Sequence, residues 1–379
     1  MKNKEYNNII KALSKLDTDE KRSLVTTIMD MMSTVCGKPV SFECNNMVQE
    51  YTFKNERPDC PHCNARANLG FILKRGFKGE TQRYFCKSCG RTFVATTKTT
   101  FEKTRKSSET WKKFIELTID GYSIAKCAEE CELAITTAFT WRHKVLNAFR
   151  VHQSSVQMSG DIEMDEMLIP VSYKGNHMKG QFSPDRRRLS GEPNNLPRKS
   201  HRRGSDSRST DVRDKACVFC MVENGNKNYF ANVPGVGYMQ ESMLESTLPK
   251  HVNKDSALII VDKYKTTLRF LDDNNYSYIS LLSNTSDNPN KHKPEILDGY
   301  HLQHVNSFHS HLRAFLAKYR GVSTKYLENY VSLFVWLKSI KANKQSRHLK
   351  RVTISRASTP DCYISRKQIE TMPAVPMCA

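Results

Sequence analysis

The stretch ALIIVD, residues 257–262, is an uninterrupted apolar run that ends at a carboxylate. Runs of this length and composition are typical of strands that are buried on both faces of a sheet. Functional side chains in α/β sheets gather at the ends of such strands. Asp262 is therefore a candidate metal ligand, although an Asp at this place is also common as a turn or capping residue.

A second acidic strand is expected upstream. Residues 161–167, DIEMDEM, alternate acidic and apolar residues, as in a strand with one buried face. If Asp165 meets Asp262 at the strand ends, the two carboxylates can bind divalent ions that act on a phosphodiester. Each Asp taken alone is also explained as a turn residue.

A β-hairpin is predicted between these two strands. Residues 216–222 and 228–233 are strand-like and flank an Asn-Gly turn. Cys217 and Cys220 lie in the first of these strands, where alternate residues point to opposite faces. We interpret them as one core and one surface residue of that strand.

The stretch VNSFHSHLR, residues 305–313, predicts an amphipathic helix, and it continues into GVSTKYL at residues 321–327. The residues of its apolar face recur at helical spacing: Val305, Phe308, Leu312, Phe315 and Tyr319. A polar stripe of Asn306, His309 and Arg313 lies beside that face. The alternative for this stripe is a solvated surface without a specific role.

Two CxxC pairs, Cys60/Cys63 and Cys86/Cys89, stand 22 residues apart. Each pair can form a tight turn, and the two turns together can complete a tetrahedral thiolate site. The chain has 12 cysteines, but its size and the lack of an export signal argue against a disulfide framework. We predict a structural zinc ion, with a redox pair as the alternative.

A helix is expected over residues 108–120. The two further helices after Ser123 predict a helix-turn-helix unit. Glu132 occupies the place in the turn that usually holds Gly. The second helix of the unit should present polar side chains to a DNA major groove. These are Thr136, Thr137, Thr140, Arg142 and His143. An ordinary helical hairpin is the alternative.

The charge balance favours a polyanionic partner. Lys and Arg exceed Asp and Glu by 20, and the isoelectric point is near 9.4. No apolar run reaches the roughly 20 residues of a membrane span, and we expect a cytoplasmic protein without a membrane partner. Residues 173–215 form a basic insertion poor in large apolar residues, suited to lie along DNA. Its candidate DNA contacts are Arg198, Arg202 and Arg203. A solvated loop is the alternative for this insertion.

With these motifs in order, the chain resembles the zinc-ribbon-bearing DDE transposases of bacterial insertion sequences, from about Cys60 to Ala342. The resemblance implies an α/β multidomain chain with an RNase H-like catalytic fold of mixed sheet. We expect a helical N-terminal segment (1–50), the zinc ribbon (51–100) and the helix-turn-helix domain (101–152). The catalytic domain (155–342), which contains the insertion, and a polar tail (343–379) follow.

The same resemblance implies the chemistry. Asp165 and Asp262 match the first two metal-binding carboxylates of the family, and Mg²⁺ or Mn²⁺ would serve as cofactor. The third is commonly a Glu three residues after an Asn, and this chain has His309 after Asn306. Arg313 would steady phosphate charge. The partners would be double-stranded DNA of the element's terminal repeats and target DNA, bound by a homo-oligomer.

Two other functions remain open. A zinc-ribbon and helix-turn-helix transcription regulator would explain the charge and the cysteines, but not the paired Asp residues. A decayed transposase that only binds DNA would explain His309 in place of the expected Glu, because Mg²⁺ prefers oxygen ligands.

Overall fold

The computed structural model describes residues 57–78, 81–104, 106–172, 174, 215–224, 228–282, 296–343 and 348–373, all within the unit Met47–Ala379. The helical segment expected at residues 1–50 lies outside them. So does the basic insertion apart from its ends, and with it Arg198, Arg202 and Arg203. Among the described helices, none has the length and apolar character needed to cross a bilayer.

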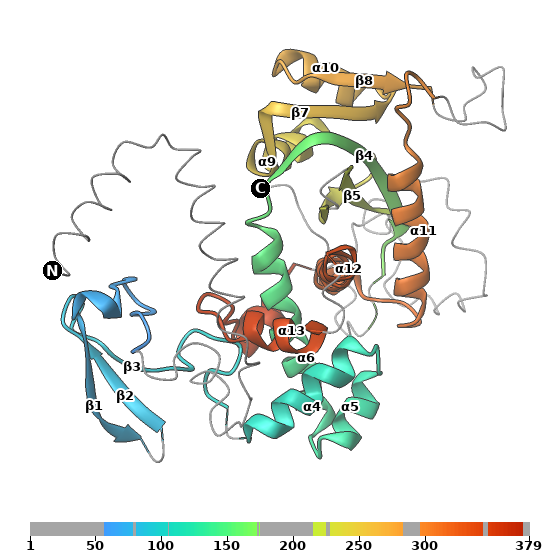
Figure 1. Ribbon diagram of the computed structural model, residues 1–379. Helices are drawn as coiled ribbons and strands as arrows, with labels where there is room; N and C mark the ends of the chain where they lie inside the picture. Colours follow the sequence, from blue (N-terminus) through green and yellow to red (C-terminus); the bar gives the residue numbers. More distant parts are fainter. Residues whose placement is uncertain are drawn as a thin grey trace, which may run out of the picture. The chain divides into compact units, whose positions relative to one another are not determined.

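The segment that carries both CxxC pairs forms a small antiparallel sheet in the order β1-β2-β3 (Figure 1). Its strands are β1 (Ile72–Lys78), β2 (Thr81–Cys86) and β3 (Thr92–Val94). Gly90 follows Cys89 with φ 70°, a left-handed conformation that Gly adopts at little cost, and its amide donates to Cys86 O. This turn brings the second cysteine pair back toward the first.

Three helices follow, namely α4 (Ser108–Ile119), α5 (Ile124–Glu130) and α6 (Ile135–Gln153). Ser107 and Ser123 cap α4 and α5 by accepting backbone N–H groups through their side chains. The indoles of Trp111 and Trp141 stack with centroids 3.5 Å apart. Glu132 has φ 51° in the turn before α6, so it takes the left-handed conformation for which Gly is favoured.

A five-stranded mixed sheet follows in the order β6-β5-β4-β7-β8, which confirms the α/β class. β4 runs antiparallel to β5, and β5 to β6, whereas β4, β7 and β8 are parallel. The bounds are β4 (Met158–Pro170), β5 (Lys215–Glu223), β6 (Tyr229–Val236), β7 (Val252–Asp262) and β8 (Tyr278–Leu281).

Helices cover both faces of this sheet. Helices α9 (Glu241–His251) and α10 (Lys265–Asp273) pack on one face through Met243, Leu244 and Phe270. Helices α11 (Gln303–Ala317) and α12 (Leu327–Ala342) pack on the other, where α11 buries Val305, Phe308 and Leu312. The apolar face predicted for residues 305–319 is thus the face of α11 that meets the sheet.

Coverage on both faces corrects two expectations. Cys217 and Cys220 do point to opposite faces of β5, but both are fully buried, because β5 lies inside the sheet; neither is a surface residue. The acidic face of β4 is also covered. Glu163 is 0% exposed beneath the start of α11, so it is not the solvent-facing side of a half-buried strand.

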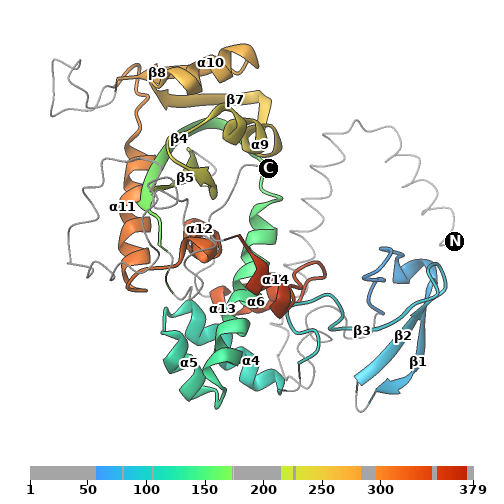
Figure 2. The same ribbon diagram turned by 180° about the vertical axis from the view of Figure 1, so that it is seen from behind.

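The segment that we assigned to a polar tail contains two helices, α13 (Leu349–Ala357) and α14 (Arg366–Thr371). Figure 2 shows them beside α6. Asn147 on α6 donates to Cys362 O at 3.0 Å, and Arg356 Nε donates to Ala148 O at 3.0 Å. These residues therefore complete the packing around α6 rather than form a solvated tail.

Candidate active site

Asp165 and Asp262 lie on neighbouring parallel strands. The register ends by pairing Glu163 with Ile260, and each of these residues stands two positions before the Asp of its strand. The two Asp residues are close enough for the Asp262 charge to act on Asp165. Because side chains alternate along a strand, both Asp residues share the face of Ile260, which α11 covers. The sheet brings the two carboxylates onto one face, with Asp262 at the end of β7 and Asp165 in the middle of β4 rather than at its end.

Acidic charge is concentrated at this place. Burial, then Glu166 and Asp262, raise the pKa of Asp165 to about 7. Burial and Asp262 raise the pKa of Glu166 to about 7 as well, and burial raises the pKa of Asp262. Partly buried carboxylates this close repel one another when ionised. A bound divalent cation would relieve that repulsion.

His309 reaches the same place from α11. The residue is 4% exposed, and its Nδ1 lies 3.8 Å from Asp165 Oδ2. Burial and the Arg313 charge lower the pKa of His309 to about 4, so the ring is neutral at pH 7 and the contact is not an ion pair. Its Nε2 is buried and has no hydrogen-bond partner within the described residues. A neutral imidazole beside two carboxylates is a suitable donor set for a divalent ion, with more affinity for Mn²⁺ than for Mg²⁺.

The other two members of the polar stripe are placed differently. Arg313, one turn after His309, is exposed, and its charge acts on both Asp165 and His309. It stands where it can meet an anionic substrate. Asn306 is exposed on α11, and no described contact brings its side chain to the two Asp residues.

The four cysteines converge. Cys60 Sγ lies 3.7 Å from Cys89 Sγ, and Cys63 Sγ lies 3.6 Å from Cys86 Sγ, with all four sulfurs within 4.8 Å of one another. Zinc–thiolate bonds of about 2.3 Å in a tetrahedron give sulfur–sulfur distances of about 3.8 Å. The cluster has the size and donor set of a structural zinc site.

The helix-turn-helix prediction is wrong for two side chains. Arg142 and His143 are each 1% exposed. Arg142 donates to Tyr122 O at 2.7 Å, and His143 Nδ1 pairs with Asn329 on α12 at 3.1 Å. Because α6 is covered by α5 on one side and by α12 on another, these residues cannot face a groove. Thr136 is exposed, and Thr137 and Thr140 are half-buried.

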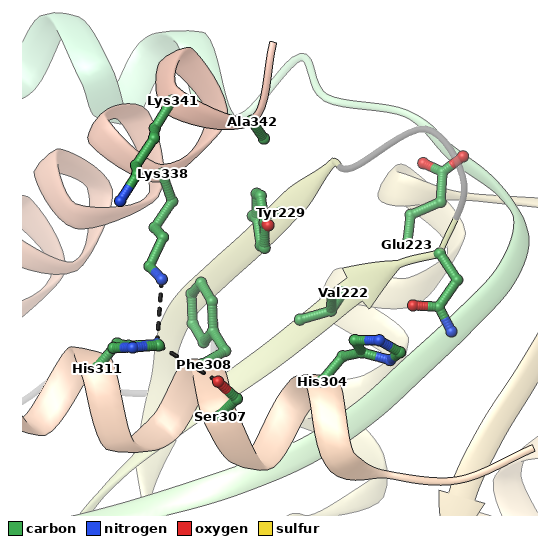
Figure 3. A pocket seen from close by; sticks show the side chains of 11 residues that line it. Val222, Glu223, Tyr229, His304, Ser307, Phe308, His311, Lys338, Lys341 and Ala342 are labelled. Carbon is green, nitrogen blue, oxygen red and sulfur yellow. Dashed lines mark hydrogen bonds between the residues drawn. The ribbon is translucent and has the colours of Figure 1, made fainter. Parts of the chain in front are cut away.

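The sequence patterns did not reveal a basic pocket. A cavity of about 540 Å³ lies between α11, α12 and the β5–β6 hairpin. Figure 3 shows the side chains that line it. Tyr229 and Phe308 stack inside it with centroids 5.7 Å apart, and Lys338 Nζ lies 3.1 Å from His311 Nδ1 at its edge. Lys338 and Lys341 stand three residues apart on α12. That spacing indicates that the two lysines share a face of the helix, but only the fold places this face opposite α11.

Glu166 was also missed, although it belongs to the acidic strand. It directly follows Asp165, whose Oδ1 accepts the Glu166 amide at 2.9 Å. Its raised pKa shows that it shares the acidic environment of Asp262. An acidic residue next to a candidate ligand was the available signal.

Comparisons with known proteins agree with this geometry. Residues 177–338, which include Asp262 and α11, match the ISXO2-like transposase domain. An uncharacterized protein in transposable element ISH50 of Halobacterium salinarum is 24% identical over 285 residues, which are 73% of this chain and 83% of that protein. Both similarities are to proteins of transposable elements, and they support the resemblance to the DDE transposases of insertion sequences.

Proposed function

We propose that this chain binds the terminal inverted repeats of its insertion sequence and catalyses metal-dependent DNA strand cleavage and strand transfer. The observation that carries the proposal is the pair Asp165 and Asp262 on neighbouring parallel strands, with His309 Nδ1 3.8 Å from Asp165. We further infer that the sheet is RNase H-like. Its order, with parallel pairing between β4, β7 and β8 and antiparallel pairing elsewhere, supports this.

Asp165 and Asp262 would hold the divalent ions, and His309 would fill the third corner in place of the Glu of related enzymes. When bound, the ions supply Lewis acidity and orient the attacking oxygen toward the scissile phosphate. Asp165 has a pKa of about 7, so it can release its proton when a cation binds near neutral pH. Arg313, exposed beside this centre, would pair with the phosphate oxygens.

DNA recognition belongs to other parts of the chain in this proposal. The four cysteines would bind a structural zinc ion, and α5 and α6 would act as a helix-turn-helix unit with Thr136, Thr137 and Thr140 at the DNA. Lys338 and Lys341 on the basic pocket would contact backbone phosphates, because Lys341 is exposed and Lys338, hydrogen-bonded to His311, holds its charge at the edge of the cavity. We expect a homo-oligomer on DNA, acting in the cytoplasm.

A transcription regulator would use the zinc cluster and the helices equally well. It gives no reason for three partly buried acids and a neutral His to share one place, since such a group is unfavourable without a cation. A decayed transposase keeps the same geometry, and activity measurements separate it from an active one.

The test is Asp262→Asn, assayed on the DNA that flanks the gene. The variant should lose cleavage by about a thousandfold or more, because a catalytic metal contributes several kcal/mol and about 1.4 kcal/mol is tenfold. DNA binding should stay within about twofold, because recognition lies elsewhere. Asp255→Asn, at an exposed position of the same strand, is the matched control. Equal cleavage by Asp262→Asn and wild type would overturn the proposed site.

A further inference from the structure

A second group of ligand-type side chains lies at the start of α11. His304 Nδ1 is 2.5 Å from Glu163 Oε1, and His301 Nδ1 is 3.3 Å from the same oxygen. One ligand atom from each of the three residues lies within 4.8 Å of the others. Glu163 is fully buried, whereas the side chains of His301 and His304 are 23% and 53% exposed. The group therefore has a fixed buried carboxylate and two imidazoles that solvent can reach.

Hydrogen bonding alone does not account for His301. The Gln303 backbone N–H donates to His301 Nδ1 at 3.3 Å, so that nitrogen presents a lone pair. Glu163 Oε1 is itself an acceptor, and it takes the Asn224 amide at 3.2 Å. Two acceptor atoms facing each other at 3.3 Å repel unless a proton or a metal cation lies between them, and a metal cation would satisfy both lone pairs.

The surroundings hold this group in place. Glu163 Oε2 accepts the Val305 amide at 3.0 Å, which fixes the carboxylate against the first turn of α11. The turn before His301 is closed by two backbone hydrogen bonds between Leu297 and Tyr300. Partners of this kind orient metal ligands in the manner of an outer coordination shell.

The group also opens onto a cavity. His301 and His304 line a space of about 510 Å³ that two further carboxylates, Asp161 and Asp298, also line. Such a space leaves coordination positions for water or for one of these carboxylates. Two imidazoles and one carboxylate with open positions are a donor set used for zinc and similar transition ions.

We propose that Glu163, His301 and His304 bind a zinc-type transition-metal ion, separate from the centre at Asp165 and Asp262. Glu163 precedes Asp165 by two residues on β4, and His304 precedes His309 by five on α11. The ion would therefore fasten the start of α11 to the strand that carries Asp165. The role of this ion would be to fix the position of α11, which carries His309. Binding of the ion can be measured without DNA cleavage.

The test is the zinc content of the purified full-length chain after dialysis, measured by mass spectrometry. His301→Ala and His304→Ala should each lower it by about one ion per chain. His311→Ala, an exposed His on the same helix, is the control and should leave the content unchanged. Cys86→Ser removes the other zinc ion independently of this site. An equal zinc content in wild type and the double variant His301→Ala/His304→Ala would overturn the proposal.

Cobalt substitution gives a second measurement. The difference spectrum between cobalt-loaded wild type and His301→Ala should show ligand-field bands without thiolate charge-transfer bands, because no cysteine belongs to this site. His301 precedes α11 and is partly exposed. If His304→Ala fails to fold, the His301→Ala variant still keeps the contact between Glu163 and the Val305 amide of α11. A flat difference spectrum would reduce the group to a hydrogen-bonded cap of α11.

Discussion

The carboxyl group of Asp165 is held near its titration point at neutral pH. Burial, Glu166 and Asp262 raise its pKa to about 7, while Arg313 partly opposes them. A carboxyl in this state gives up its proton to a metal ion at little cost, and it is partly protonated at neutral pH when no ion is present. Asp165 is thus suited to a site that fills and empties.

These pKa shifts predict how the stability of the metal-free protein depends on pH. Between about pH 4 and 7 the folded state holds protons on Asp165 and Glu166 that the unfolded chain has released, so stability falls as pH rises. His309 acts in the opposite sense, since its pKa is lowered to about 4 and its contribution rises with pH up to about 6.5. Within this site the two acids outweigh the one His, so the contribution of the site should be a loss, while the buried His143, His152 and His251 act in the same sense as His309.

Urea unfolding in EDTA at pH 5 and pH 8 measures this loss. Asp165→Asn should reduce the difference between the two pH values by on the order of 2 kcal/mol. Asp255→Asn is the control, because Asp255 is exposed on β7. If the free energy of unfolding changed equally between pH 5 and pH 8 in wild type and in Asp165→Asn, the pKa of Asp165 would not be raised in the folded protein.

His309 is the residue that separates an active enzyme from a decayed one. His309→Ala should lower cleavage by about a hundredfold or more with both Mg²⁺ and Mn²⁺, because the site loses a ligand. His309→Glu should keep cleavage and shift the preference toward Mg²⁺, since it restores an oxygen donor. The measurement is the cleavage rate on element-end DNA, with Ser310→Ala, at an exposed position of the same helix, as control.

Two outcomes would change the interpretation of His309. Cleavage by His309→Ala at the wild-type rate would exclude it as a ligand. Cleavage by His309→Glu, in a background where wild type cuts with neither ion, would identify a decayed transposase.

The candidate ligands were predictable from the sequence, because strands alternate with period two and α11 has a clear apolar face.

The burial of Arg142 and His143 was not predictable from the sequence. Helical periodicity shows that a face exists, but α6 is covered on one side by α5 and on another by a segment distant in sequence, which includes Asn329 and Tyr326 near the start of α12. The role of Glu163 was not predicted for the same reason, because its hydrogen-bond partners come from α11.

At the scale of elements, the cysteine cluster is local: its four sulfurs come from residues 60–89, and its core is Ile72, Tyr84 and Phe93. So small a core depends on its metal. Chelation or Cys86→Ser should therefore unfold this sheet and weaken DNA binding, while the thermal transition of the rest stays within a few degrees. Zinc content and calorimetry check this. Purified wild-type protein without zinc would contradict it.

The strands and most helices were predictable because each has its own pattern, such as the apolar run of β7 or the Ser caps of α4 and α5. Helices α13 and α14 were missed because both are short and mostly polar. Helix α13 buries only Thr353, Ile354 and Ala357. Their stability comes from packing against α6 that no local pattern reveals.

For the whole molecule, the excess of 20 positive charges predicts strongly salt-dependent binding to DNA. Replacing residues 186–203 by a neutral linker of equal length should weaken binding. It should also lower the slope of log affinity against log salt by about one for each phosphate that the insertion neutralises. Fluorescence anisotropy over a salt series measures it. An unchanged slope would show that this insertion does not lie on DNA.

Asp262 holds the ion that cuts DNA in the proposed mechanism, and exchanging this one ligand tests that role. A thiolate binds Mn²⁺ better than Mg²⁺ because Mn²⁺ is the softer ion. Strand cleavage by Asp262→Cys should therefore be abolished with Mg²⁺ and partly return with Mn²⁺, while wild type cuts with both. Cleavage by Asp262→Cys with Mg²⁺ at the wild-type rate would contradict the assignment of Asp262 as a metal ligand.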